Sequence, residues 1–292
     1  MTPPPITRRR QHRRLLLAAF ALAIVTVVLV VELGPPPADV GRELTEQQVL
    51  PAASPQTSSS TASSRRDAIA AEPMPSVRPA DSRPTTTVPQ TAGVVEVPPA
   101  SVVGPAGVPS GFPRTPEGAV GQLAALVARV LEQMSLPRTA AIHEAWVLPG
   151  AVPAEGWELT GHVRAFLTAA GASTELGAAG EVAAVPAAGL VKGTDGPDWV
   201  LACVLLEVRA TVVVEARMGF GHCERQQWHP DRPPSATDRT RDGTAELGRW
   251  MVAPGAPPAV APSTWPGSEA SRRAGWRPWA ELVWSDLPVE DR

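Results

Sequence analysis

WVLACVLLEVR (Trp199–Arg209) and VVVEARMGFGHCERQQW (Val212–Trp228) decide the fold of this chain. Side chains alternate between the two faces of a β-strand, and every even position from 200 to 208 is apolar. The even positions from 216 to 222 carry Ala, Met, Phe and His and also share one face. One antiparallel register places these two rows opposite each other. The two stretches therefore predict neighbouring antiparallel strands with one mainly apolar face.

Further strands are predicted at Val182–Lys192 and Arg249–Ala253, and three helices precede them. The first helix begins at Thr115-Pro116-Glu117, because Thr is a good N-cap and Pro fits the first helical position. Leu136-Pro137 is expected to end it. The other two helices are predicted at Arg138–Trp146 and from about Trp157 to Ala170.

These elements predict an α+β domain over residues 113–285, in which helices pack on a curved antiparallel sheet. The loop His229–Gly248 is predicted to be an exposed excursion, and residues 286–292 a short tail. Near the end, a short helix is expected at Ser268–Gly275. Four tryptophans are interpreted as anchors that fasten the last segment to the domain, with an exposed docking patch as the alternative: Trp265, Trp276, Trp279 and Trp284.

The N-terminal region predicts a membrane anchor. Leu15–Val31 contains 17 residues without a charge, close to the minimum that spans a bilayer, and the predicted helix runs to Leu33. Five arginines in residues 1–14 predict a cytoplasmic tail, which places the rest of the chain outside. The alternative is a cleaved signal peptide, although no Ala-x-Ala site follows the apolar run. Either interpretation puts the domain in the same compartment.

Residues 34–112 read as a stalk between anchor and domain. They contain 14 Pro and 17 Ser or Thr, and no aromatic residue precedes Phe112 in this range. Such a composition buries too little apolar surface to offset the entropy of the chain. We therefore expect a disordered, extended linker.

Cys203 and Cys223 are the only two cysteines of the chain. The register proposed above places them directly opposite each other, and opposed Cα atoms at such a position are about 4.5 Å apart, within reach of a disulfide. A compartment outside the cytoplasm is oxidising. A Cys203–Cys223 disulfide is therefore predicted, and two free buried thiols are the alternative.

Composition argues against nucleic-acid binding. Residues 113–292 carry 16 Arg or Lys against 21 Asp or Glu, a net charge of −5. Phosphate affinity depends on clustered cations, so no nucleic acid is expected as a partner. The 25 arginines against one lysine fit a GC-rich genome rather than a binding function.

The motifs of common catalytic sites are absent: there is no nucleophile elbow, phosphate loop, dinucleotide fingerprint or His-Glu-x-x-His. His222-Cys223 with His229 has poor metal spacing, because adjacent strand residues point to opposite faces. Neither a metal nor a cofactor is expected.

Single polar residues are given structural interpretations. His222 is expected to be a hydrogen-bonded core residue, and His143 and His162 isolated structural residues. Glu224-Arg225 and Glu215-Arg217 are expected to form ion pairs on the strand faces.

The chain resembles a group of actinobacterial single-pass membrane proteins of conjugative and integrative elements. The resemblance is carried by TPEGAVGQLAAL (Thr115–Leu126), LVKGTDGPDWVLACVLLEV (Leu190–Val208), GFGHCERQQW (Gly219–Trp228) and GRWMVAPGAPPAVAPSTWPGSEA (Gly248–Ala270). It implies a nuclear-transport-factor-like (cystatin-like) domain with a cone-like sheet, similar to the bitopic scaffold subunits of type IV secretion machines. No functional residue is carried over.

The expected function is therefore non-enzymatic: a scaffold or assembly component of a conjugation or secretion apparatus. The chain would sit in the plasma membrane, with its C-terminal domain extracellular. Its partners would be the bilayer, through Leu15–Leu33, and other envelope proteins, with self-association as a further option. One alternative is an enzyme or small-ligand binder with Asp198 or Glu207 as a buried general base. Another is a protein that binds or senses the cell wall.

Overall fold

The computed structural model describes residues 57–90, 93–231 and 248–281. The predicted cytoplasmic tail (1–14), the membrane helix (15–33) and the C-terminal tail (286–292) lie outside these ranges, as does most of the loop His229–Gly248. Within the described ranges, none of the helices combines the length and apolar character that a membrane crossing needs.

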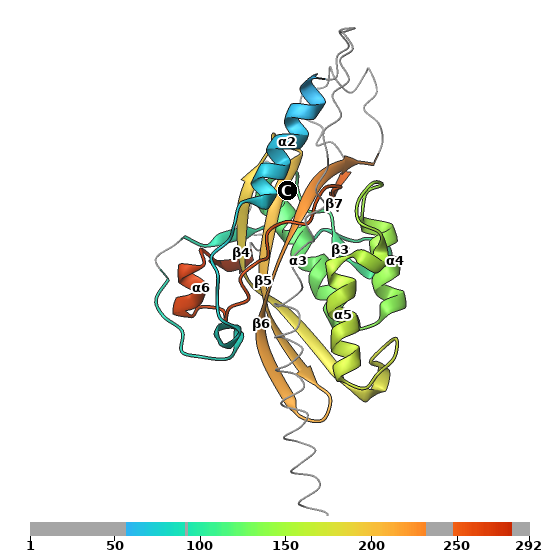
Figure 1. Cartoon of the computed structure of the whole chain (residues 1–292), viewed down its shortest axis with the longest axis vertical. Coiled ribbons are helices and arrows are strands. Elements are labelled where there is room, and N and C mark those ends of the chain that lie inside the picture. The colour runs from blue at the N-terminus through green and yellow to red at the C-terminus, as the bar shows by residue number, and fades with distance from the viewer. Residues whose placement is uncertain (1–56, 91–92, 232–247, 282–292) are drawn as a thin grey trace, which may run out of the picture.

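A curved six-stranded sheet forms the centre of the domain, in the order β1-β8-β4-β5-β6-β7 (Figure 1). Its antiparallel part contains the four strands predicted from the sequence: β4 (Glu181–Thr194), β5 (Trp199–Thr211), β6 (Glu215–Pro230) and β7 (Gly248–Val252). β5 and β6 pair in the predicted register, with Val204 opposite His222. The alternation of side chains therefore identified both the strands and their pairing.

The sheet is mixed, which corrects the prediction of an antiparallel sheet. β1 (Val95–Val97) pairs in parallel with β8 (Arg277–Glu281), with Val95 opposite Trp279. Val95 and Val97 are buried while Glu96 is exposed, the alternation of a strand with one buried face. A three-residue strand from the predicted stalk thus completes one edge of the sheet.

Three helices cover one face of the sheet: α3 (Pro116–Gln133), α4 (Leu136–Trp146) and α5 (Glu158–Ala169). As predicted, Thr115 caps α3, and its hydroxyl accepts a hydrogen bond of 3.0 Å from the Gly118 amide. Leu136-Pro137 does not end this helix. Helix α3 ends one turn earlier because Met134 adopts a left-handed backbone with a φ of 36°, and Pro137 lies in the first turn of α4, where its missing N–H costs little.

The main core lies between these helices and what we call the helix side of the sheet. The apolar row of β5 packs there against α3, with side chains fully or almost fully buried on both elements. The residues of this contact are Val200, Ala202, Val204 and Leu206 from β5, and Val120, Leu123, Val127 and Val130 from α3.

The opposite face, which we call the outer side, is covered by α2 (Thr57–Ala71), by residues 72–90 and by residues 253–276, which include α6 (Glu269–Arg273). The last of these segments lies very close to β6. A Cβ added to Gly219 would come within 1.8 Å of the Thr264 carbonyl oxygen. Glycine at this position lets the two backbones approach.

The prediction of a disordered linker over residues 34–112 is therefore wrong for the described part from residue 57 onward. α2 and β1 lie in this range, and five of its apolar residues are buried: Ala70, Val95, Val97, Val108 and Phe112. Apolar residues are sparse here, but these five are buried against the sheet or the helices. The folded unit therefore begins well before residue 113.

Shorter elements complete the described chain. They are η1 (Pro79–Ser82), β2 (Val102–Val103), η2 (Pro105–Gly107), β3 (Pro109–Ser110), η3 (Ala154–Gly156) and η4 (Gly177–Ala179). Trp265 and Trp276 are buried and Trp279 packs against the main core, which confirms these three as anchors. Trp284 lies outside the described residues.

Candidate functional site

The helix side of β6 carries an unusual row of side chains. Even positions of this strand point toward the helices, and from residue 220 to 228 they are Phe, His, Glu, Gln and Trp. The facing row of β5 is entirely aliphatic. Polar groups in such an interior need partners, because an unpaired buried polar group costs about 1–3 kcal/mol. His222 and Glu224 contact each other, and their other partners come from the start of α5.

Helix α5 meets this row at its N-terminal end. Trp157, which precedes the helix, donates a hydrogen bond of 2.8 Å from its indole Nε1 to Oε1 of Glu224. Glu158 occupies the first turn, where a carboxylate complements the positive end of the helix. The start of α5 therefore contributes one donor and one carboxylate to the same cluster.

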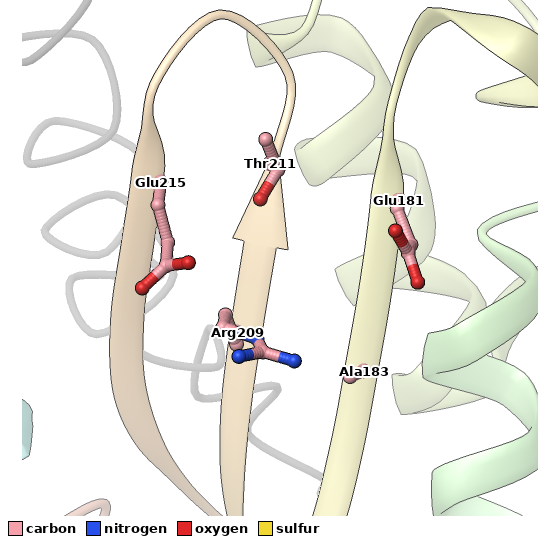
Figure 2. A pocket seen from close by; sticks show the side chains of 5 residues that line it. All are labelled: Glu181, Ala183, Arg209, Thr211 and Glu215. Atoms are coloured by element: carbon pink, nitrogen blue, oxygen red, sulfur yellow. The ribbon is translucent and has the colours of Figure 1, made fainter.

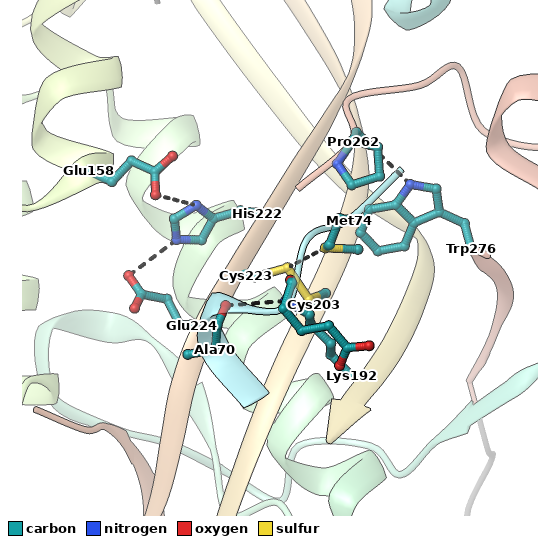
Figure 3. Close-up of a disulfide and its surroundings, with 11 residues drawn as sticks. Ala70, Met74, Glu158, Lys192, Cys203, His222, Cys223, Glu224, Pro262 and Trp276 are labelled. Atoms are coloured by element: carbon teal, nitrogen blue, oxygen red, sulfur yellow. Dashed lines mark hydrogen bonds and ion pairs between the residues drawn. A yellow bond between two sulfur atoms is a disulfide. The ribbon is translucent and has the colours of Figure 1, made fainter. Parts of the chain in front are cut away.

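His222 lies between two carboxylates (Figure 3). Its side chain is 1% exposed; Nε2 is 3.3 Å from Oε1 of Glu224, and Nδ1 is 3.8 Å from Oε2 of Glu158. Burial disfavours the charged imidazolium, but the hydrogen bond with Glu224 and the negative charges of Glu158 and Glu224 outweigh it. The pKa of His222 is therefore raised above its ordinary value.

Glu158 is the outermost member of the cluster, with a side chain that is 45% exposed. Burial opposes its ionisation, but the hydrogen bond with His162 and the charges of His222 and His162 lower the pKa of Glu158 to about 2. Nε2 of His162 lies 3.4 Å from Oε1 of Glu158. Phe220 contacts His162 edge-on, with ring centroids 5.1 Å apart. His162 therefore belongs to the cluster, which corrects its interpretation as an isolated residue.

This cluster places an imidazole, whose pKa is raised, between two carboxylates. Such a group can fasten a helix to a sheet, and an imidazole can also exchange protons. Several neighbouring polar atoms have no hydrogen-bond partner among the described residues: both amide atoms of Gln226, Nε1 of Trp228 and Oγ1 of Thr160. Buried polar atoms therefore surround the four titratable residues of the cluster, which are His222, Glu224, Glu158 and His162.

The candidates for a buried general base fall elsewhere. Asp198 is 46% exposed and pairs with Arg114. Glu207 lies on the outer side of the sheet and pairs with Arg217. Neither carboxylate joins the His222 cluster. In the described part of the chain, no group of three or more His, Cys, Asp or Glu side chains could hold a metal ion.

The predicted ion pairs on the strand faces are also re-assigned. Glu224 points to the helix side, whereas Arg225 points to the outer side and pairs with Asp67 of α2 at 2.9 Å. Glu215 is not the partner of Arg217, which pairs with Glu207 from the neighbouring strand. Alternation separates adjacent residues on a strand, so sequence neighbours are poor guides to its ion pairs.

The predicted disulfide between Cys203 and Cys223 is present, with Cα atoms 4.0 Å apart. It lies on the outer side of the sheet and is buried (Figure 3). The sulfur of Met74, from the segment after α2, lies 3.5 Å from Sγ of Cys223. The segment predicted to be disordered therefore covers the disulfide.

A second polar site is an open cleft of about 180 Å³ where β4, β5 and β6 meet near the β5–β6 turn (Figure 2). It lies on the outer side, beyond the segments that cover the disulfide. The cleft is lined by Glu181, Ala183, Arg209, Thr211 and Glu215.

The chain was compared with protein-family models, curated proteins and solved structures. No protein-family model matches the chain, and neither the curated proteins nor the solved structures contain a match. The alternation of β6 was the available signal for the His222 cluster, since His222 and Glu224 share a face. The contribution of Glu158 could not be read in this way, because it depends on where α5 crosses the sheet.

Proposed function

We propose that this chain is a non-enzymatic, membrane-anchored assembly subunit of the cell envelope, working with a conjugation or secretion apparatus. The observation that carries the proposal is the buried Cys203–Cys223 disulfide. Stable structural disulfides belong to oxidising compartments. The bond therefore supports delivery of the domain to the extracellular side of the membrane by the predicted anchor at Leu15–Leu33.

The arrangement of the domain also supports this role. Most of its helix side is packed with aliphatic and aromatic side chains, and the chain's own segments cover the outer side around the disulfide. Asp198 and Glu207, the expected bases, are both held in ion pairs near the surface. A rigid body attached to an anchor suits the placement of partners in an envelope assembly.

Topology and partner capture test the proposal together. An alkaline phosphatase fusion at the C-terminus should be active, and a green fluorescent protein fusion should not. Mild crosslinking of the full chain in its native membrane, followed by purification, should recover further envelope proteins. A fusion that is active only in the cytoplasm would refute the proposal. So would unchanged DNA transfer or secretion after deletion, if the crosslinked product also lacked any other envelope protein.

The His222 cluster favours a second candidate, a proton-transfer or small-ligand site. Its specific observation is a buried imidazole within 4 Å of two carboxylates, beside polar atoms without partners. Ligand screening by NMR on the full chain would test it. Chemical shift changes confined to His222, Glu224 and Gln226 would support this candidate, and their absence with every ligand class would remove it.

A further inference from the structure

One end of the sheet is left open on its outer side. The β5–β6 hairpin reaches the end of the domain opposite α2, the described element closest in sequence to the predicted anchor (Figure 1). Around its turn, Glu181, Arg209 and Glu215 are exposed, in contrast to the covered strand positions near the disulfide. We call the exposed side chains of Glu181, Val185, Arg209, Val213 and Glu215 the hairpin face.

The turn itself has unusual chemistry. Turns are normally built from Gly, Pro, Asn, Asp or Ser, but this one is Val212-Val213-Val214. Val213 is 65% exposed and Val214 45% exposed, and Val185 on the adjacent strand is 60% exposed. Exposed β-branched residues at a turn offer no local advantage to the hairpin. They are suited to an apolar contact with another surface.

The charges of the hairpin face carry a second anomaly. Arg209 lies directly opposite Arg217 in the β5–β6 register, and opposed like charges destabilise a strand pair. Arg217 is compensated by Glu207 and also lies over the ring of Trp265. Among the described residues, Arg209 takes part in no ion pair, although it lies between Glu181 and Glu215 in the cleft (Figure 2). A carboxylate from outside would relieve this repulsion.

A second copy of the chain supplies that carboxylate. An interface with two-fold symmetry brings each residue of a surface against its counterpart region, so a surface that carries both charges beside an apolar centre complements itself. Here Arg209 and Glu215 flank the exposed valines. A two-fold arrangement can therefore join Arg209 of each copy to Glu215 of the other, with the Val213 side chains in contact between them.

We propose that the hairpin face is a self-association surface, through which two copies of this chain pair head to head by their β5–β6 hairpins. The proposal rests on the proposed function, because it specifies how the assembly subunit contacts its own kind. A purely acidic or purely basic partner would leave part of the mixed surface unmatched. A second copy matches both signs and the apolar centre with one contact.

Crosslinking in native membranes tests the position of the contact. In the full chain, Val213→Cys should form a disulfide-linked dimer on a non-reducing gel, because the two side chains lie near the symmetry axis. Val260→Cys is the matched control, since Val260 is 71% exposed and lies in the segment between β7 and α6. Equal dimer yields from the two variants, or a crosslink from Val213→Cys only to a different protein, would overturn the proposal.

Charge exchange tests the proposed pairs. Sedimentation of the purified full chain in detergent should show self-association that Arg209→Glu weakens by about tenfold or more. The double variant Arg209→Glu/Glu215→Arg should restore it, because the exchanged pairs form again across the axis. Arg209→Glu also places a third carboxylate beside Glu181 and Glu215, so a thermal unfolding curve of each variant serves as the control for folding.

Loss of self-association in a variant that still unfolds cooperatively distinguishes a contact surface from a residue that matters only for folding. A wild-type chain that stays monomeric, association that is insensitive to Arg209→Glu, or a double variant that stays monomeric would each overturn the proposal. A monomer that still recovers other envelope proteins would leave the proposed function intact. A dimer in a chain that recovers no other envelope protein would support the self-association surface and count against the proposed function.

Discussion

Removal of the Cys203–Cys223 disulfide is the perturbation whose size can be worked out most directly from the structure. The two cysteines are 20 residues apart in the sequence. In the chain-entropy model, a crosslink that closes a loop of this length restricts the unfolded chain by about 3 kcal/mol at 25 °C. The double variant Cys203→Ala/Cys223→Ala should therefore lose about 2–3 kcal/mol of unfolding free energy, since measured effects often fall below the model.

Urea denaturation of the purified full chain, followed by tryptophan fluorescence, measures this loss. The midpoint should fall in the double variant, and a reductant should lower the wild-type midpoint to the same value. The control is the double variant itself, which the reductant should leave unchanged. The reasoning would be refuted by equal midpoints in wild type and variant, or by two thiols that can be alkylated in the native protein.

Three further predictions concern the cluster, the close backbone approach and the docking of α2. Because the pKa of His222 is raised in the folded protein, its contribution to stability is complete below the unfolded value of about 6.5 and is lost as the pH rises through the folded value. His222→Gln should flatten the fall in thermal midpoint as the pH rises above about 6.5, and a slope identical to wild type would contradict the role of the cluster. Gly219→Ala should lower the unfolding free energy by about 1–3 kcal/mol, because its Cβ would overlap a backbone carbonyl. The control is Gly161→Ala on α5, which has open space around its Cβ and should be neutral or stabilising by up to about 1 kcal/mol. Equal denaturation midpoints for the two variants would refute the close backbone approach. Asp67→Asn leaves Arg225, whose side chain is 4% exposed, without its carboxylate partner. It should cost about 1–3 kcal/mol and speed proteolysis of residues 57–90, and an unchanged digestion pattern would show that α2 does not depend on this pair.

The His222 cluster adds a constraint to experiments at low pH. The pKa of Glu158 is lowered to about 2, so its contribution is present above its ordinary value near 4.5 and is lost as the pH falls from there toward 2. Water screens this half-exposed carboxylate, which keeps its share small. Together with His222, it places the strongest attachment of α5 to β6 between about pH 4.5 and 6.5.

Local patterns were sufficient to predict much of the central fold. Alternation defined β5 and β6, and their two facing rows defined the β5–β6 register, because a shift by one residue would turn the aliphatic row of β5 toward the outer side. Capping chemistry likewise located the start of α3 at Thr115. These features depend on residues close together in the chain or on one pair of strands.

The tertiary structure decided what depends on distant segments. Composition pointed to disorder for the region of α2 and β1, yet the sheet provides Asp195 and Arg225 as partners for α2 and β8 as the neighbour of β1. Glu158 joins His222 and Glu224 only because α5 begins beside the helix side of β6. The sequence by itself determined the strand periodicity and the cysteine pairing, since both follow from the geometry of one extended backbone. Only the folded domain determined which residues of α2 and β1 form contacts. Ordering these segments costs conformational entropy, and the contacts that offset this cost exist only once the sheet has formed.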